Sequence, residues 1–402
     1  MYEEKFVGTR CQICVGCGRC MPDRQIHTIT SSSLPGALFQ IPSEAGENRR
    51  LICADIGTTT VAMQLYDRQG RVVHEFARVN PQTLYGADVL SRIQACEQGT
   101  HLWMMQRQIR GLLEEGLKEM QTFLEPGEVP LMMVAGNTTM NYLFMGWNPR
   151  ELGRAPFTAS HLEEIHTQVG EVSCVLLPGF SAFVGGDIFA GVIACRMEEQ
   201  EELTLLIDLG TNGEMVLGNR EKMLACATAA GPAFEGGVNR GIWGADMVHL
   251  IATLRQKEFV DETGLLKEPY FDKGILIGDV RVTQEAIRAI QLAKGAIAAG
   301  IRILMKEYGI EGQWNRIGRV VLAGGFGYYL NPQDAAQIGL LPKEFLGKTQ
   351  AGGNTALAGA CRYGVQMRMQ KQSTGLKNVV SVLNLAKHPD FDQIYLDYLN
   401  LE

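Results

Sequence analysis

The stretch Leu51-Ile-Cys-Ala-Asp-Ile-Gly-Thr-Thr-Thr60 has a second, altered copy in the chain, which runs Leu205-Leu-Ile-Asp-Leu-Gly-Thr-Asn-Gly213. Each copy is an apolar run that ends in an aspartate and continues into glycine and threonine. Such a run predicts a buried strand that enters a tight turn. The two aspartates, Asp55 and Asp208, lie 153 residues apart. Repetition of one strand-and-turn unit predicts two related halves, with a boundary near residue 200.

The two turns have the composition of a phosphate-binding site. Glycine lets the backbone approach a phosphate because it has no Cβ, and successive N–H groups and threonine hydroxyls can bind anionic oxygens. A strand-end aspartate would repel a phosphate, so it normally acts through a hydrated divalent cation. We therefore expect Asp55 and Asp208 to lie beside Mg²⁺. The residues expected to contact a nucleotide are Gly57, Thr58, Thr59, Thr60, Gly210, Thr211, Asn212 and Gly213. One copy alone would be typical of an ordinary hairpin, and two copies favour the nucleotide interpretation.

Three further segments are expected to line the same site. The apolar strand 320–323 runs into a third glycine turn, on which a base and ribose could lie; a loop that only requires positive φ is the alternative. A short strand, 131–135, ends before an asparagine that could line the site or form an Asx turn. A glutamate in a glycine-rich loop could contact the ribose or a magnesium-bound water, or be a solvated loop acid. The residues concerned are Gly324, Gly325, Phe326, Gly327, Asn137 and Glu235.

The composition excludes several classes of function. The chain has 402 residues, and its 37 basic and 44 acidic residues give a net charge of 37 − 44 = −7. A general nucleic-acid binder needs a basic face, which this balance does not predict. No apolar run approaches the ~20 residues of a membrane span, and the first ten residues lack the apolar core of a secretory signal. We expect a cytoplasmic protein with reduced thiols and two or three domains.

Four of the ten cysteines, Cys11, Cys14, Cys17 and Cys20, follow one another with two residues between each pair. Four thiolates on a short loop of this kind hold iron–sulfur clusters, which gives these reduced cysteines a role other than disulfide formation. Zinc is the alternative, although zinc ribbons separate their two Cys-x2-Cys pairs by about 15–20 residues. The other six cysteines lie in apolar contexts and are expected to be small buried residues.

The chain divides into four expected segments. The cysteine segment covers 1–24, a polar, turn-rich linker covers 25–50, and the two halves cover 51–200 and 201–402. Periodicity predicts helices at the following positions: 86–96, 103–123, 186–197, 284–307 and, opened by Gly352-Gly-Asn354, up to Cys361. Thr283 is the expected N-cap of the long helix, whose isoleucines lie on one face. The tail 378–402 is expected to add a short strand and a helix to the second half.

The order of these motifs resembles that of a known superfamily. The Asp55 turn, Gly185-Gly-Asp187, the Asp208 turn and Leu322-Ala-Gly-Gly-Phe-Gly327 follow one another as in acetate and sugar kinases, heat-shock chaperone ATPases and actin. The resemblance implies an α/β fold of two ribonuclease-H-like halves with ATP and magnesium in the cleft between them. Asp187 is similar in position to a catalytic aspartate of the sugar kinases, so it is expected to position an attacking water. A helix N-cap is the alternative.

Four blocks resemble a narrower family, the reductive activators of corrinoid-dependent enzymes. They are Asn80-Pro-Gln-Thr-Leu-Tyr-Gly-Ala-Asp-Val-Leu-Ser-Arg92, Gly136-Asn-Thr-Thr-Met140, Ala229-Ala-Gly-Pro-Ala-Phe-Glu-Gly236 and Gln291-Leu-Ala-Lys294. The resemblance covers about residues 50–400. It implies an ATP hydrolase that returns a corrinoid protein from cobalt(II) to cobalt(I) with an electron from its iron–sulfur cluster. The implied partners are a corrinoid-binding methyltransferase protein and a separate ferredoxin-type donor, and the implied assembly is a homodimer.

The N-terminal segment departs from the family pattern, in which a whole ferredoxin-like domain typically precedes the ATPase. Cys11, Cys17 and Cys20 match part of a two-iron ferredoxin pattern, but about 24 residues are too few for that domain. A four-iron cluster is therefore favoured over a two-iron cluster.

Other functions stay open at this point. A small-molecule kinase or a regulatory ATP switch would leave the cysteines unexplained. An activator of a 2-hydroxyacyl-CoA dehydratase would differ only in its partner.

Overall fold

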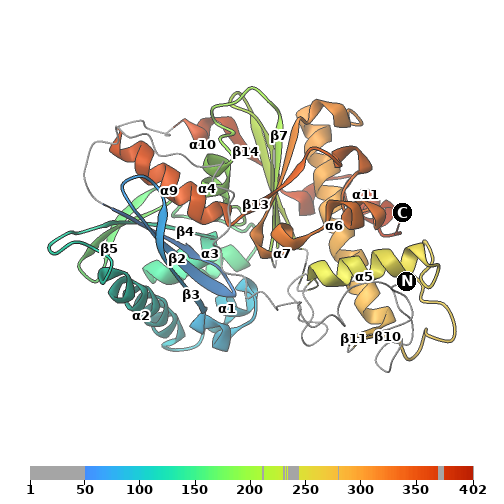
Figure 1. Ribbon diagram of the computed structural model, residues 1–402, viewed down its shortest axis with the longest axis horizontal. Helices are drawn as coiled ribbons and strands as arrows, with labels where there is room; N and C mark the ends of the chain where they lie inside the picture. Colours follow the sequence, from blue (N-terminus) through green and yellow to red (C-terminus); the bar gives the residue numbers. More distant parts are fainter. Residues whose placement is uncertain are drawn as a thin grey trace, which may run out of the picture.

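The computed structural model describes residues 50–210, 212–229, 231, 233, 244–278, 280–369 and 375–401. The cysteine segment 1–24 and all of the linker except residue 50 lie outside the described residues. The described chain forms two six-stranded sheets, each flanked by helices, which lie next to each other along the long axis of the molecule (Figure 1). The predicted α/β class with two sheets is confirmed.

The first sheet is built from the sequence before residue 180. Its strands are β1 (Leu51–Ile56), β2 (Thr60–Tyr66), β3 (Val72–Val79), β4 (Leu131–Gly136), β5 (Ile165–Val169) and β6 (Val172–Leu176). Their order across the sheet is β3-β2-β1-β4-β6-β5. β4 runs parallel to β1 and β6, and the other neighbours are antiparallel. Asp55 on β1 is in register with Ala135 on β4, so these strands end together at one edge.

The second sheet repeats this arrangement. Its strands are β7 (Thr204–Leu209), β8 (Gly213–Gly218), β9 (Met223–Thr228), β12 (Arg319–Ala323), β13 (Thr349–Gly353) and β14 (Val380–Val382), in the order β13-β12-β7-β8-β9-β14. β7, β8, β9, β12 and β13 have the neighbours and directions of β1, β2, β3, β4 and β6. Asp208 is in register with Ala323, as Asp55 is with Ala135. The repeat predicted from the two sequence copies is therefore a repeat of topology.

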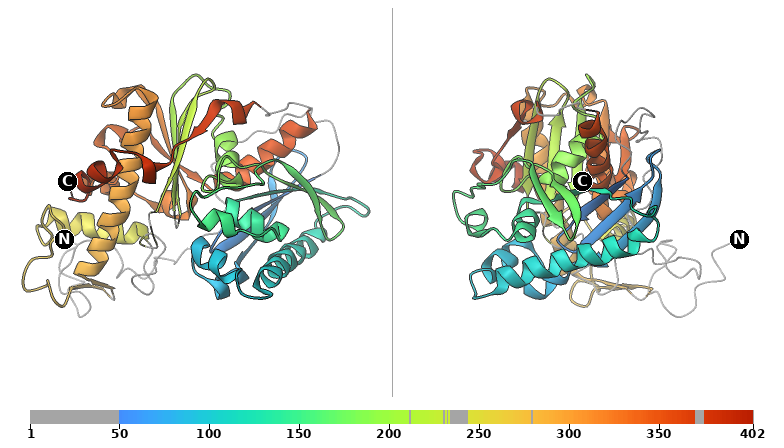
Figure 2. Two further views of the ribbon diagram at one scale, coloured as in Figure 1. Left: turned by 180° about the vertical axis from the view of Figure 1, so that it is seen from behind. Right: turned by 90° about the vertical axis from the view of Figure 1, so that its left-hand side faces the viewer.

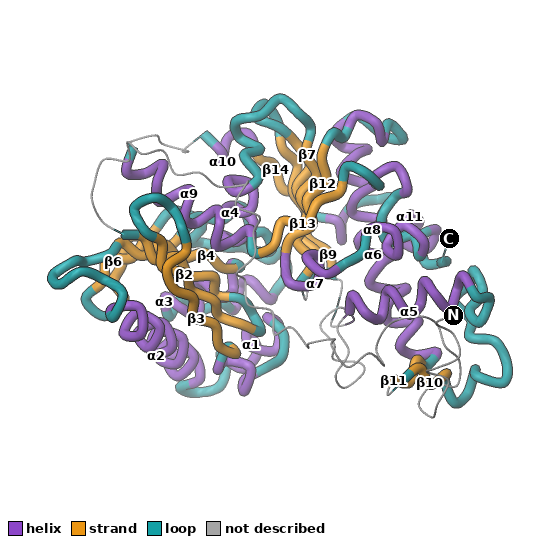
Figure 3. The backbone as a smooth tube through the Cα atoms, in the orientation of Figure 1, coloured by secondary structure: helices purple, strands orange, loops and turns teal. Residues whose placement is uncertain are grey.

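Helices cover the faces of both sheets (Figures 2 and 3). They are α1 (Val89–Ala95), α2 (His101–Gln121), α3 (Thr138–Met145), α4 (Gly186–Ala194), α5 (Gly244–Gln256), α6 (Gln284–Tyr308), α7 (Gly324–Tyr329), α8 (Pro332–Gln337), α9 (Thr355–Arg368), α10 (Leu376–Val379) and α11 (Phe391–Asp397). A small hairpin, β10 (Ile275–Ile277) with β11 (Val280–Val282), precedes α6. Of the helices that the structure describes, none is long and apolar enough to cross a membrane.

Most predicted elements lie where the sequence placed them. The helix predicted up to Cys361 continues to Arg368 as α9, and Gly352 and Gly353 belong to the strand before it. Two other elements differ. The first predicted helix begins later, at Val89, because Pro81–Tyr85 forms a 3-10 helix (η1) and Asp88 caps α1. The segment that begins at Gly324 is the first turn of α7 and not a free glycine turn. Thr283 is confirmed as the N-cap of α6, since its Oγ1 accepts a hydrogen bond from the Ala286 N–H at 3.2 Å. The tail forms β14 and α11, and α11 packs on α6 as expected.

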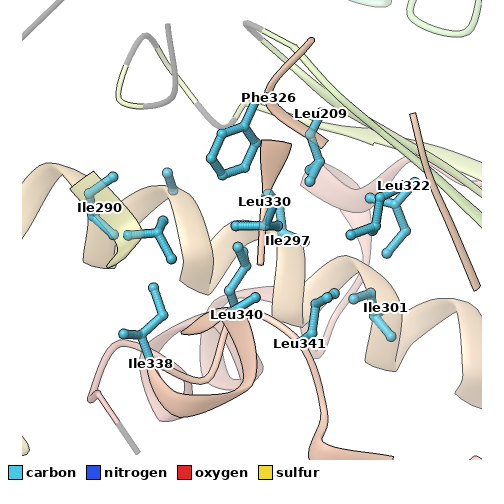
Figure 4. Close-up of a cluster of buried hydrophobic side chains, with 14 of the residues drawn as sticks. Leu209, Ile290, Ile297, Ile301, Leu322, Phe326, Leu330, Ile338, Leu340 and Leu341 are labelled. Carbon is cyan, nitrogen blue, oxygen red and sulfur yellow. The ribbon is translucent and has the colours of Figure 1, made fainter. Parts of the chain in front are cut away.

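The isoleucine face of α6 packs into the core of the second half. Ile287, Ile290, Ile297 and Ile301 are all buried there. Figure 4 shows Phe326, which belongs to α7, and Leu330, which follows α7, in the same cluster. Five of the six described cysteines are buried and Cys96 is half-buried, which agrees with the expectation that they are small packing residues.

Two helices join the halves. α4 follows the first sheet in the sequence and contacts β4 and β7, whereas α9 follows β13 and packs on β1, β2 and β4 of the first sheet. The two helices also pack against each other, and one buried core contains residues from both sheets. At the helix contact, a Cβ on Gly359 would overlap the backbone of Ala190. The two helix backbones therefore approach each other at a point that only glycine fits.

This contact predicts a stability difference between two glycine-to-alanine substitutions in helices. Gly359→Ala should destabilise the protein by ~2 kcal/mol or more, because the added methyl group meets backbone atoms that cannot move aside cheaply. Gly111→Ala on α2 is the matched control, since a Cβ there meets no atom within 4 Å. It should be neutral or stabilise by up to ~1 kcal/mol. Urea unfolding of both variants measures the difference, and equal midpoints would contradict the packing described.

Candidate functional site

Four acidic side chains interact at the junction of the two halves. Asp55 lies near the end of β1, Asp208 near the end of β7, Glu214 on β8, and Asp187 in the first turn of α4. The charge of Asp187 acts on each of the other three carboxyl groups, and Asp55 also acts on Asp208. The repeated topology explains the convergence, because β1 and β7 are equivalent strands. The three predicted catalytic aspartates are thus brought together, and Glu214 joins them.

Burial raises the pKa of every member of this cluster. It raises the pKa of Asp55 to about 7, that of Asp187 to about 6 and that of Asp208 to about 8. Burial also raises the pKa of Glu214 well above its usual range, and the neighbouring acids add to the effect at Asp55, Asp208 and Glu214. Desolvation and like charges both disfavour the ionised form of a carboxyl group. The cluster therefore carries protons near neutral pH unless a cation compensates its charge.

The described groups that oppose these shifts are amides. The Asn354 Nδ2 group donates to Asp55 Oδ2 at 2.8 Å, the Ile188 N–H donates to Asp187 Oδ1 at 2.8 Å, and the Asn212 side chain hydrogen-bonds Glu214. Such hydrogen bonds favour the ionised form without neutralising it. Clustered carboxylates held by amides have the chemistry that suits a hard divalent cation. Within the described ranges, however, no three His, Cys, Asp or Glu side chains are placed to hold a metal ion directly.

The turn between β1 and β2 is held from behind by two residues of the block 80–92. The Asn80 Nδ2 group donates to the Gly57 carbonyl at 2.8 Å, and the Asn80 N–H donates to the Thr59 carbonyl at 2.8 Å. Arg92 is fully buried, and its Nη2 donates to the Thr58 carbonyl at 2.5 Å. These bonds occupy the carbonyl groups of the turn. They leave Thr59 and Thr60 exposed, as a phosphate-binding turn requires.

Asn137 lies beside this turn. Its Nδ2 donates to Thr58 Oγ1 at 3.1 Å, while its Oδ1 caps α3 by accepting from the Met140 N–H at 2.9 Å. The N-cap of α4 next to it is Gly185, where a Cβ would lie 2.5 Å from the Thr138 nitrogen. Asp187 itself lies in the first turn of α4 and is not its cap, so the capping alternative for Asp187 is wrong.

Gly324 contacts the acid cluster from the second half. Its φ is +78°, and a Cβ on it would lie 2.6 Å from Asp208 Oδ1. The backbone at Gly324 thus requires a positive φ. This was the alternative interpretation of the third glycine turn. Phe326 belongs to the buried core (Figure 4), so any contact that it makes with a nucleotide would come from its backbone. The Gly210 N–H donates to the Asn212 carbonyl at 2.9 Å, which closes the turn after β7.

Several predicted site residues lie outside the described residues. They are Thr211, Glu235, Cys11, Cys14, Cys17 and Cys20. Their proposed roles stay predictions.

Four residues of the site were not singled out from the sequence as site residues: Asn80, Arg92, Glu214 and Asn354. Arg92 ends a block that was noted only for its resemblance, and an arginine on an apolar helix face was the available signal. At Asn354 the sequence indicated only the start of a helix. Asn354 does cap α9.

A separate cavity of about 180 Å³ lies in the second half, away from the four acids. The guanidinium of Arg302 stacks at 4.8 Å over Trp314 and at 4.1 Å over Tyr398 in its wall. None of the acid-cluster residues lines it.

The duplicated topology and the paired acidic strand ends are those of an actin-like ATPase fold. Family models agree and are more specific. The model described as the RACo middle region matches residues 51–200, and the model described as the C-terminal domain of RACo, the ASKHA domain, matches 202–241 and 237–402. The chain therefore belongs to the RACo family.

Individual relatives carry related names. The chain is 29% identical to the corrinoid activation enzyme RamQ of Eubacterium limosum, over 92% of this chain and 73% of RamQ. It is 22% identical to a Co(II) methylated amine-specific corrinoid protein reductase of Methanosarcina barkeri, over 76% of this chain and 68% of the reductase. A solved reductive activator for corrinoid, iron–sulfur protein superposes with a TM-score of 0.78 at 28% identity, over 89% of this chain and 66% of that one. The chain thus spans between 66% and 73% of these proteins.

The raised pKa values predict how stability depends on pH in the absence of nucleotide and divalent cations. The pKa values of Asp55, Asp187 and Asp208 are higher in the folded protein than the ~3.9 of an unfolded chain. The stability that this difference contributes is complete below pH ~4 and is lost as pH rises through about 6 to 8. The melting temperature should therefore fall as the pH is raised from about 5.5 to about 8.5.

Asp208→Asn should flatten this dependence and raise the melting temperature at the alkaline end, because one buried carboxylate is removed. Asp392→Asn, at an exposed position on α11, is the control and should follow the wild-type curve. Parallel curves for all three proteins would show that the cluster is not desolvated.

Proposed function

We propose that the chain is an ATP-dependent reductive activator that returns a corrinoid protein from cobalt(II) to cobalt(I). Membership of the RACo family and the names of its relatives support the corrinoid partner. The observation that supports ATP hydrolysis is the convergence of Asp55, Asp187 and Asp208 beside two glycine turns of a duplicated fold. We further propose that the partner is a corrinoid-binding methyltransferase protein.

The described residues suggest a division of roles. Asp55 and Asp208 would hold a hydrated Mg²⁺ ion, which when bound supplies positive charge to the phosphates of ATP. Asp187 would orient the attacking water and accept its proton, since a carboxyl group with a pKa of about 6 is suited to general base catalysis near neutral pH. Thr58, Thr59 and Asn137 would donate hydrogen bonds to phosphate oxygens.

ATP would act on the partner through the arrangement of the two halves. Its phosphates would contact residues from both sheets, so ATP would bind most tightly when the halves are close together. A ligand shifts a conformational equilibrium only by its difference in affinity between the two states. The proposed contacts to Asp55 on β1 and Asp208 on β7 supply such a difference. The partner would respond if it also binds one arrangement better than the other.

Electron delivery is proposed for the segment outside the described residues. Cys11, Cys14, Cys17 and Cys20 would hold a four-iron cluster within segment 1–24, which when bound supplies a single electron at low potential. The linker 25–50 would let this segment move relative to the halves 51–200 and 201–402. We also propose a separate ferredoxin-type donor, a homodimeric assembly and a cytoplasmic location.

Substitution of Asp208 tests the proposed ATPase. Asp208→Asn should keep the fold but lower the turnover of magnesium-dependent ATP hydrolysis by ~100-fold or more, because one charge that would hold the metal is lost. The rate is measured by phosphate release with and without a corrinoid partner, and Asp392→Asn is the control. Turnover near that of the wild type in Asp208→Asn would reject the metal assignment.

Substitution of Cys17 separates electron transfer from ATP hydrolysis. Cys17→Ser should remove or degrade the cluster, because a serine hydroxyl is a poor iron ligand, while ATP hydrolysis should stay within ~2-fold of the wild type because the linker separates the two parts. The anaerobic assay follows the visible spectrum of a cobalt(II) corrinoid protein after ATP and a strong reductant are added.

Cobalt reduction at the wild-type rate by Cys17→Ser would take the cluster off the electron path. Zinc in place of iron in the anaerobically purified protein would reject the redox role altogether. A wild-type protein that activates a 2-hydroxyacyl-CoA dehydratase, and no corrinoid protein, would reject the proposed partner.

A further inference from the structure

The side-chain amide of Asn354 makes two hydrogen bonds in different parts of the molecule. Its Oδ1 accepts from the Leu357 N–H at 2.8 Å, which caps α9, and its Nδ2 donates to Asp55 Oδ2 at 2.8 Å. The orientation of the amide is determined by these partners. A flipped amide would place its oxygen against a carboxylate and its NH₂ group against an N–H donor. Asn354 therefore links the start of α9 to the acid cluster through one rigid, planar group.

The sequence positions of the two partners make this link unusual. Asn354 directly follows β13 of the second sheet, whereas Asp55 belongs to β1 of the first sheet. The helix that begins after Asn354, α9, packs on β1 and on α4. The hydrogen bond thus holds an acid of the first half through a side chain of the second half.

We infer that Asn354 is a positioning residue that holds the Asp55 carboxylate in the orientation that the proposed ATP hydrolysis requires. The inference rests on the proposed function. Asparagine suits the role better than the other good capping residues. Serine or threonine would cap α9 with a shorter side chain, and aspartate would cap α9 but turn a carboxylate toward Asp55. Only asparagine combines a capping oxygen with an N–H donor at this reach.

Two substitutions separate capping from positioning. Asn354→Ser keeps a capping hydroxyl and removes the amide donor, and Asn354→Asp keeps the cap and adds a like charge. Asn331→Ser is the matched control, because Asn331 caps α8 by accepting from the Gln333 N–H at 2.8 Å and is exposed. We expect Asn354→Ser to lower kcat for ATP hydrolysis by ~10-fold or more with a change in KM of less than ~3-fold, since orientation rather than nucleotide binding is lost. Asn354→Asp should be slower still, and Asn331→Ser should keep the wild-type kcat.

A capping role alone would change the melting temperature of Asn354→Ser as much as that of Asn331→Ser and leave kcat unchanged, and this result would overturn the inference. A double-mutant cycle of Asp55→Asn with Asn354→Ser, read on the melting temperature, tests the contact without any activity. The two changes should be non-additive by a few degrees, and additive changes would overturn the inference as well. If the wild-type chain neither binds nor hydrolyses ATP, the proposed function fails, and the role of Asn354 toward Asp55 is then decided by the cycle.

Discussion

The junction of the two halves is dominated by the desolvation of four neighbouring acids, of which Glu214 is buried and Asp55, Asp187 and Asp208 are half-buried. Asp55, Asp187, Asp208 and Glu214 each have a raised pKa because they are removed from water, and like charges raise those of Asp55, Asp208 and Glu214 further. Moving an ion from water into protein costs several kcal/mol even after relaxation. Selection for stability alone would place apolar side chains here. A cluster that is retained against this cost is typical of a functional site.

The duplicated topology is what concentrates these acids. Equivalent strands, β1 and β7, end at the same junction and bring one aspartate each. α4 and α9 cross from one half to the other, and the glycine contact between Gly359 and Ala190 holds their backbones together. Each helix also begins at the acid cluster, α4 with Asp187 and α9 with Asn354. The packing of the junction and the geometry of the site therefore depend on the same two helices.

The sequence predicted those parts of the site that are encoded locally. An apolar run that ends in aspartate and glycine is a local signal, so Asp55 and Asp208 and the repeated sheet could be predicted. Arg92 and Asn354 could not, because their partners lie 34 and 299 residues away in the chain. The start of α7 was missed for a different reason. Its glycines oppose helix formation, and burial of Phe326 and Leu330 in the core outweighs that preference.

The electrostatics of the cluster also gives a physical reason for the proposed action of ATP. Without a counter-charge, ionised Asp55 and Asp208 repel each other across the junction, which favours separation of the two halves or protonation of the acids. A hydrated cation that arrives with ATP would reverse the sign of this interaction, because it attracts both carboxylates at once. α4 and α9 pack on each other and on both sheets, so such a change would act through these two helices. Charge compensation at the acids would in this way favour one arrangement of the halves, and a partner would respond only if its own affinity differs between the arrangements.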